Sequence, residues 1–314
     1  MIEVESITKR YGSLVAIKDV SFTVEKGEIV GFLGPNGAGK TTTLKIITCY
    51  MPPTEGKVMV DGIDCLENSL AVRKRLGYLP ESVPLYKEMT VKRFLNFVAE
   101  SKGIEGKSRG KEIDRVTETC GLSKVKNRII GHLSKGYRQR VGIAQALIND
   151  PPILIFDEPT IGLDPSQIIE IRQLIKDLGE EKTIILSSHI LPEVSQVCQK
   201  VIIINKGKII ATETPANLTA QLQKSTRIVL QVKSDSQPIE AIIDKLSNIQ
   251  GVKNITREDH NGTLIVETDQ SKDLRPTISR TVIENNWDLI EIKLHDFSLE
   301  DIFLELVTKE EEAA

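Results

Sequence analysis

The feature that most constrains this 314-residue chain is a glycine-rich segment, GPNGAGKTT, at Gly34–Thr42. It follows the strand-like EIVGFLG and leads into the helix-like TTLKIIT. The segment fits the pattern G-x-x-x-x-G-K-[ST], in which glycines let successive backbone N–H groups face one anion. The N-terminus of the following helix adds a partial positive charge. The sequence therefore predicts a phosphate-binding loop between a buried strand and a helix.

Two side chains of this segment indicate a bound nucleotide. Lys40 is placed to reach the β- and γ-phosphates, and Thr41 is placed to hold Mg²⁺. The alternative is a glycine-rich turn that only connects a strand to a helix, and the lysine and threonine together disfavour it. The residues expected to bind the nucleotide here are Gly34, Pro35, Asn36, Gly37, Ala38, Gly39, Lys40, Thr41 and Thr42.

An acidic pair ends a second apolar segment, ILIFDEPT, at Ile153–Thr160. A buried strand that ends at Asp157 places this carboxylate at the carboxyl edge of a sheet, where ligands bind in α/β folds. We expect Asp157 to coordinate Mg²⁺ and Glu158 to act as the general base for an attacking water. A solvated strand end is the alternative, and the nearby phosphate loop makes it less favoured.

Residues 1–215 are predicted to form one nucleotide-binding domain of the α/β class. The apolar runs Ile153–Asp157 and Thr183–Ser188 flank the helix-like stretch Gln167–Leu178. This order is typical of a P-loop NTPase with a mainly parallel sheet covered on both faces. A helical pattern from about 72 to 145 predicts a separate helical subdomain.

The character of the chain changes near Pro215. From there on it carries 11 Lys and Arg against 18 Asp and Glu, whereas the preceding part carries 30 against 26. We interpret residues 216–224 as a linker and 225–314 as a small C-terminal α+β domain. Its pattern of strands and helices has the β-α-β-β-α-β order of a ferredoxin-like fold, with a hairpin turn at Asn261-Gly262.

The closing segment FSLEDIFLELV has a helical pattern that allows two interpretations. Ser298 and Asp301 resemble a capping box, and Leu299, Ile302, Phe303 and Leu306 form one apolar stripe. Packing on the small sheet is favoured over a partner-binding helix. The terminal KEEEAA is interpreted as a solvated tail.

Composition excludes several classes of protein. The four cysteines have no CxxC spacing, so no disulfide framework or zinc site is predicted, and a reducing compartment is expected. A net charge of -3 argues against a dedicated nucleic-acid binder. No run approaches the roughly 18 apolar residues of a membrane-spanning helix. Any membrane function must therefore come from a partner.

The octapeptide LSKGYRQR at 133–140 contains no carboxylate, histidine or cysteine, so it offers neither a metal site nor a general base. Its first five residues resemble LSGGQ, the signature of the ATP-binding subunits of ABC transporters. Leu133, Ser134 and Gly136 are retained, while Lys135 and Tyr137 replace Gly and Gln. The alternatives are a solvated basic face and an RNA-binding run, which do not explain the Leu-Ser-x-Gly frame.

The resemblance implies a head-to-tail dimer in which Ser134 and Gly136 cap the γ-phosphate held by the other subunit. It also implies that Tyr11 stacks on adenine, that Ile161–Pro165 runs along the dimer seam, and that His189 touches the γ-phosphate. A surface tyrosine and a structural histidine are the plainer alternatives. One position departs from the family, since Glu81 stands where a glutamine is usual. We hypothesise that Glu81 faces the metal and senses the membrane partner.

The C-terminal part resembles the accessory domain of ABC exporter ATPases for multidrug export, copper-enzyme maturation and gliding motility. The resemblance implies an ATP- and Mg²⁺-dependent ATPase at the inner face of the membrane. It would drive a separately encoded permease as a homodimer or with a paralogous subunit. The alternative is a soluble ABC ATPase that acts on nucleic acid or the ribosome. A regulatory nucleotide-binding module without turnover is a third possibility, which Glu158 disfavours.

Overall fold

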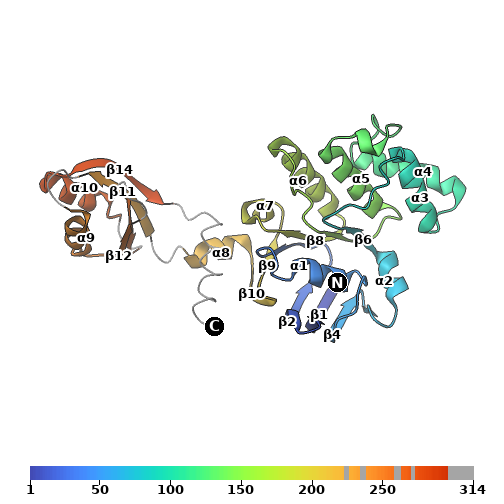
Figure 1. Cartoon of the computed structure of the whole chain (residues 1–314), viewed down its shortest axis with the longest axis horizontal. Helices are drawn as coiled ribbons and strands as arrows, with labels where there is room; N and C mark the ends of the chain where they lie inside the picture. The colour runs from blue at the N-terminus through green and yellow to red at the C-terminus, as the bar shows by residue number, and fades with distance from the viewer. Residues whose placement is uncertain (223–225, 234–237, 258–262, 270–272, 296–314) are drawn as a thin grey trace. The chain divides into compact units, whose positions relative to one another are not determined.

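The fold is described from a computed structural model of the whole chain. The structure describes residues 1–222, 226–233, 238–257, 263–269 and 273–295. They belong to two compact units, Met1–Pro215 and Ala216–Ala314, each of which is described by itself (Figure 1).

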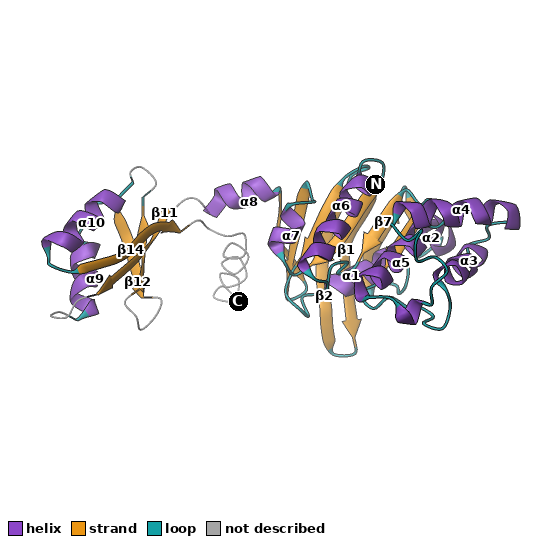
Figure 2. Ribbon diagram, turned by 90° about the horizontal axis from the view of Figure 1, so that it is seen from above, coloured by secondary structure: helices purple, strands orange, loops and turns teal. Residues whose placement is uncertain are grey.

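A six-stranded sheet forms the centre of the first unit, in the order β10-β9-β3-β8-β7-β6. All neighbours pair in parallel except β9 and β10. The strands are β3 (Ile29–Leu33), β6 (Leu76–Leu79), β7 (Ile153–Phe156), β8 (Thr183–Ser188), β9 (Lys200–Asn205) and β10 (Lys208–Glu213). Every residue of β3, β7 and β8 is buried, as expected of parallel strands covered on both faces (Figure 2).

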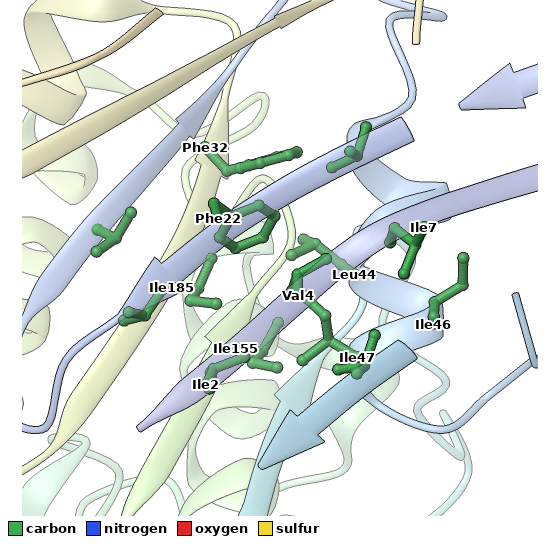
Figure 3. Packing of buried hydrophobic residues seen from close by; sticks show 14 of the residues in the cluster. Ile2, Val4, Ile7, Phe22, Phe32, Leu44, Ile46, Ile47, Ile155 and Ile185 are labelled. Atoms are coloured by element: carbon green, nitrogen blue, oxygen red, sulfur yellow. The ribbon is translucent and has the colours of Figure 1, made fainter. Parts of the chain in front are cut away.

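An antiparallel sheet of order β2-β1-β4-β5 packs against this centre. Its strands are β1 (Ile2–Tyr11), β2 (Leu14–Val24), β4 (Glu55–Val60) and β5 (Ile63–Asp64). Figure 3 shows Ile2 and Ile7 of β1 in one cluster with Leu44 and Ile47 of helix α1 (Lys40–Ile47). The apolar face of α1 is therefore fixed in the core while its N-terminus stays at the phosphate loop.

Helices α3, α4 and α5 pack on one another beside the β6 edge of the sheet (Figures 1 and 2). The helices of this unit are α2 (Ser69–Arg75), α3 (Val91–Ser101), α4 (Gly106–Thr119), η1 (Ile130–His132), α5 (Lys135–Leu147), α6 (Pro165–Gly179) and α7 (Leu191–Ser195). The predicted helical pattern from about 72 is wrong for residues 76–79, which form strand β6 of the parallel sheet. Four apolar residues are too few for their periodicity to separate a strand from a helix.

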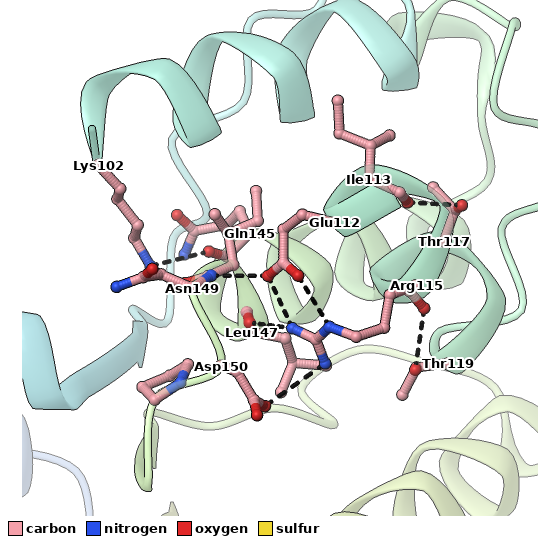
Figure 4. A network of polar contacts seen from close by, with 12 residues as sticks. Lys102, Glu112, Ile113, Arg115, Thr117, Thr119, Gln145, Leu147, Asn149 and Asp150 are labelled. Atoms are coloured by element: carbon pink, nitrogen blue, oxygen red, sulfur yellow. Dashed lines mark hydrogen bonds and ion pairs between the residues drawn. The ribbon is translucent and has the colours of Figure 1, made fainter. Parts of the chain in front are cut away.

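A partly buried polar network ties the helical part to the segment that leads into β7 (Figure 4). Arg115 of α4 makes two hydrogen bonds to Glu112 and a third to the Leu147 carbonyl oxygen at the end of α5. Glu112 in turn accepts from the backbone N–H of Asn149 at 2.7 Å. Lys102 donates to the Ile148 carbonyl oxygen, and burial lowers the pKa of Lys102 to about 8. These contacts fix the direction in which the chain enters β7.

The second unit contains an antiparallel sheet of order β12-β13-β11-β14 with two helices packed on one shared core. Its elements are α8 (Pro215–Leu222), β11 (Thr226–Lys233), α9 (Ile239–Ser247), β12 (Val252–Arg257), β13 (Thr263–Thr268), α10 (Arg275–Glu284) and β14 (Asp288–His295). From β11 on, this is the ferredoxin-like order. Helix α8 occupies most of the segment interpreted as a linker. The predicted turn at Asn261-Gly262 and the FSLEDIFLELV segment lie outside the described residues.

Candidate functional site

The phosphate loop connects the buried strand β3 to the N-terminus of α1. Gly39 caps α1 with φ 109°, a value that side-chain-bearing residues rarely adopt. A Cβ atom at Gly34 would collide with the carbonyl oxygen of Ile204 in β9, so this position has no room for a side chain. The loop is therefore a close-packed turn whose backbone N–H groups lead into the helix N-terminus, which favours an anion.

Lys40 is the first residue of α1, and only 6% of it is exposed. Its Nζ donates to the carbonyl oxygens of Gly34 at 2.7 Å and Pro35 at 3.2 Å. The same Nζ lies 3.5 Å from Oε1 of Glu158, which is also buried. The ammonium therefore bridges the phosphate loop and the acidic end of β7.

A cavity of about 340 Å³ lies over this loop. Its lining residues are Ala16, Pro35, Asn36, Gly37, Gly39, Lys40, Thr41, Thr42, Glu81, Glu158 and Ile161. The structure thus brings together three predicted groups from distant parts of the sequence: the phosphate loop, Glu81 and Glu158. Predicted residues that do not line this cavity are Tyr11, Gly34, Ala38, Ser134, Gly136, Asp157 and His189.

Asp157 follows β7 and is fully buried. Its Oδ1 accepts a 2.6 Å hydrogen bond from Ser187 Oγ of β8, and Ser187 Oγ accepts from the Glu158 N–H. Oδ2 of Asp157 has no hydrogen-bond partner among the described residues. Ser187 therefore fixes both acids, although the sequence analysis did not single it out. The sequence feature that could have indicated Ser187 is its position in an apolar strand next to the strand that leads into the acidic pair.

Glu158 has a backbone φ of 50°, in the left-handed region that non-glycine residues rarely occupy. Such strain persists where the surrounding contacts fix the conformation, often at functional sites. Nδ1 of His189, in the turn after β8, lies 3.1 and 3.0 Å from the two carboxylate oxygens of Glu158. The carboxylate thus lies within 4 Å of both Lys40 and His189.

A second cavity of about 560 Å³ shares Thr41 and Glu81 with the first and also includes Asp157 and Tyr78. The hydroxyl of Tyr78 is buried and has no hydrogen-bond partner among the described residues. Burial and the negative charges of Asp157 and Glu81 raise the pKa of Tyr78, so this hydroxyl stays protonated at neutral pH. The sequence analysis did not identify Tyr78 as a site residue.

The signature segment lies at the start of α5. Ser134 is the N-cap residue of this helix, and its Oγ accepts from the Tyr137 N–H at 3.4 Å. A Cβ atom at Gly136 would require the side chain of Gln167 to move. Neither Ser134 nor Gly136 lines either cavity beside the phosphate loop. The structure thus places no signature residue at the chain's own phosphate loop.

Tyr11 lies at the end of β1 and is 46% exposed. Its hydroxyl donates to the Met51 sulfur at 3.0 Å, and the Lys9 ammonium lies 5.7 Å from its ring centroid. It does not line the cavity over the phosphate loop, so stacking on adenine stays a prediction. Glu81, in contrast, lines both cavities, and its contact with a metal also stays a prediction.

The fold and the site together define a P-loop ATPase, because a phosphate loop and an acidic strand end meet at the carboxyl edge of a parallel sheet. Comparison with known proteins gives the family. The family model described as "ABC transporter" matches residues 17–161. The bacitracin transport ATP-binding protein BcrA of Bacillus licheniformis is 34% identical over 310 residues, which cover 98% of this chain and 97% of BcrA.

Other similar proteins agree. The ABC transporter ATP-binding protein NatA of Bacillus subtilis (strain 168) is 43% identical over 197 residues, which cover 62% of this chain and 80% of NatA. A solved dimer of an ATP-binding cassette in a post-hydrolysis state with ADP and Pi has a TM-score of 0.63 and 30% identity. The match covers 68% of this chain and 98% of the chain in that structure. This chain belongs to the ABC transporter family as an ATP-binding subunit with ATPase activity.

Proposed function

We propose that ATP is hydrolysed where the phosphate loop meets the acidic end of β7. The observation that carries this proposal is the cavity over the phosphate loop, because Lys40, Thr41 and Glu158 all line it. Lys40 would exchange the carbonyl oxygens of the loop for β- and γ-phosphate oxygens. Because the loop N–H groups and the N-terminus of α1 favour anions, they would hold the phosphates beside Glu158.

Glu158 is proposed as the general base. Its carboxylate would accept a proton from a water whose oxygen bonds to the γ-phosphorus, while the bond from that phosphorus to the bridging oxygen of ADP breaks. With Lys40 drawn to the phosphates, Glu158 loses the cation beside it and becomes free to bind the water. His189, which is already within 3.1 Å of Glu158, would orient the carboxylate and reach the γ-phosphate.

Unpaired oxygen atoms in the second cavity support a Mg²⁺ site. Mg²⁺ in such sites keeps several waters and takes few protein ligands. The described residues contain no cluster of three His, Cys, Asp or Glu that could hold a metal without the nucleotide. Oδ2 of Asp157 and the Thr41 hydroxyl could bind the ion or its waters, and the Tyr78 hydroxyl could donate to a water ligand. When bound, Mg²⁺ would neutralise charge on the β- and γ-phosphates.

The unusual carboxylate at Glu81 gives a direct test of the metal site. Because a carboxylate attracts Mg²⁺ but repels a polyphosphate, Glu81→Gln should raise the Mg²⁺ concentration for half-maximal ATPase activity by at least about threefold. It should also strengthen ATP binding measured without Mg²⁺. The matched control is Glu88→Gln, a change of an exposed residue in the same connection. Unchanged Mg²⁺ dependence and turnover in Glu81→Gln would remove Glu81 from the metal site.

The position of the signature supports a head-to-tail dimer. Ser134 and Gly136 form a helix N-terminus that lies outside the chain's own phosphate cavity, so a second chain would have to present its phosphates to it. The hydroxyl and N–H groups there would stabilise charge on the transferred phosphoryl group. Solved cassettes of similar fold are described as dimeric, which agrees with this arrangement.

A mixing experiment tests the dimer. Ser134→Asp keeps a good N-cap but places a negative charge toward the γ-phosphate, so its ATPase activity should fall at least tenfold. Lys40→Ala should also be inactive alone. In an equal mixture, half of the randomly paired dimers have one site made of two intact halves, so up to about a quarter of the wild-type activity should return at saturating ATP. Full activity of Ser134→Asp alone would contradict the shared site, and Ser134→Asn is the neutral capping control.

We further propose that the chain energises an exporter through a separate membrane permease. No helix among the described residues is long and apolar enough to cross a membrane. Relatives matched over nearly the whole chain have names that refer to bacitracin transport and linearmycin resistance. These transport names favour this function over a soluble ATPase acting on nucleic acid or the ribosome. The test is to purify this chain from membranes. If it were recovered without a protein that crosses the membrane several times, the proposed permease partner would be contradicted.

The C-terminal unit is proposed as the accessory domain of such exporter subunits. Its ferredoxin-like order and the similarity of BcrA over 98% of the chain support this assignment. The ATPase would then lie at the inner face of the membrane, held there by the permease. The dimer could contain two copies of this chain or one copy and a paralogue. The subunit composition of the complex purified with its permease would distinguish these two arrangements.

A further inference from the structure

Two cysteines that line neither cavity of the phosphate site lie close together in the first unit. Cys49 follows α1, and Cys65 follows the short strand β5. Both thiols donate to one acceptor, the carbonyl oxygen of Ile47, at Sγ–O distances of 3.9 Å for Cys49 and 3.7 Å for Cys65. The two sulfur atoms therefore flank a single oxygen atom.

The backbone holds both cysteines in place. The Cys49 N–H donates to Ile46 and the Cys65 N–H donates to Val58, each at 3.0 Å. Both side chains line a cavity of about 180 Å³, and Met51 lines it as well. Small molecules can therefore reach a pair of thiols that the fold has already brought together.

The two thiols differ in exposure and acidity. Cys49 is partly exposed, whereas only 7% of Cys65 is exposed. The interaction with the Cys65 side chain lowers the pKa of Cys49, and the same pairing together with burial raises the pKa of Cys65. An accessible thiol that ionises readily beside a buried thiol is the arrangement of a reactive cysteine and its resolving partner.

The other two cysteines provide an internal comparison. Cys120 and Cys198 are buried, and burial raises the pKa of both thiols, that of Cys120 to about 12. In the described part of the chain, neither Cys120 nor Cys198 interacts with another cysteine. They should react slowly with oxidants, because the thiolate is the reactive form.

We propose that Cys49 and Cys65 form an oxidation site that a hydroperoxide converts into an intramolecular disulfide. The Cys49 thiolate attacks one peroxide oxygen, so that an S–O bond forms, the O–O bond breaks, and hydroxide leaves and is protonated to water. The Cys65 sulfur then attacks the Cys49 sulfur, so that the S–S bond forms and a second water leaves with the Cys65 proton. Two thiols are oxidised and one peroxide is reduced.

Peptide mapping of the peroxide-treated full chain tests this proposal. Reduced protein is exposed to hydrogen peroxide, remaining thiols are alkylated, and peptides are identified by mass spectrometry. We expect the loss of two of the four thiols, one peptide pair linked through Cys49 and Cys65, and recovery of both thiols with a dithiol reductant. Cys49 should react at least about tenfold faster than Cys120 or Cys198.

Single variants separate the two steps. Cys65→Ser should form no disulfide and should leave a Cys49 sulfenic acid that a 1,3-diketone reagent traps, whereas Cys49→Ser should keep Cys65 reduced. The matched controls Cys120→Ser and Cys198→Ser should give the wild-type linked peptide. Equal oxidation rates at all four cysteines, or links only between chains, would overturn the proposal. Because the wild-type map needs no variant, it decides the question even if a variant does not fold.

Discussion

Glu158→Gln should bind ATP but hydrolyse it at least tenfold more slowly, and up to about 10⁴-fold more slowly if the whole contribution of a general base is lost. A carboxamide has nearly the size of the carboxylate, so the contacts to the loop change little. It cannot accept the proton of the attacking water. The γ-phosphate is proposed to contact both chains of the dimer, and hydrolysis would remove it from the nucleotide. The variant should therefore accumulate as an ATP-bound dimer. Phosphate release and size-exclusion chromatography measure the two effects.

The matched control for this variant is Glu180→Gln, which makes the same change at an exposed position after α6. It should leave turnover and dimer content unchanged. A Glu158→Gln chain that is monomeric and fully active would rule out Glu158 as the base. His189 would then be the next residue to test, since it is the other titratable side chain within 3.1 Å of that carboxylate.

Lys40→Ala should weaken ATP binding about 10- to 100-fold and abolish measurable turnover. The estimate follows from the loss of a charged hydrogen bond of about 1.5–3 kcal/mol, with 1.4 kcal/mol for each factor of ten. The effect on binding has two sources. The variant loses the ammonium that would face the β- and γ-phosphates, and it leaves the buried Glu158 without the cation at 3.5 Å. Titration with a fluorescent ATP analogue and a steady-state ATPase assay would measure both effects.

The control is Lys26→Ala, which removes an exposed lysine from the turn between β2 and β3. Its affinity and turnover should match those of the wild type. If Lys40→Ala kept both the wild-type ATP affinity and the wild-type turnover, the phosphates would have to bind elsewhere than on this loop. If ATP binding were retained but turnover were lost, Lys40 would stabilise the transition state and not the bound ATP.

Local motifs allowed most of the fold and part of the site to be predicted. The phosphate loop is a short segment in which glycine, lysine and threonine each have one physical task, so the sequence alone locates it. The buried strand before Asp157 and the alternation of the C-terminal strands were also readable, because long apolar or period-two patterns have few alternatives. Strand β6 was not predicted, since LGYL is short and lies beside helical segments.

Other features of the site depend on which strands become neighbours. The contacts of Ser187 with Asp157 and Glu158 arise because β8 pairs with β7 in the sheet. The Tyr78 hydroxyl reaches the acidic cavity because β6 lies on the other side of β7. Neither neighbour follows from residue spacing along the chain. The pairing of Cys49 with Cys65 is likewise a product of tertiary packing and carries no sequence motif.

The continuity of α5 with β7 has a consequence for how two sites would behave together. Helix α5 begins directly after its N-cap Ser134 and runs for 13 residues or about 20 Å. The chain then continues through the segment fixed by Arg115 and Glu112 into β7. The N-terminus of α5 would contact the nucleotide of the neighbouring chain, and β7, at the other end of this connected segment, leads into Asp157 and Glu158. Occupancy of one pocket would thus displace the acids of the other. ATP consumption by the dimer should rise sigmoidally with ATP concentration.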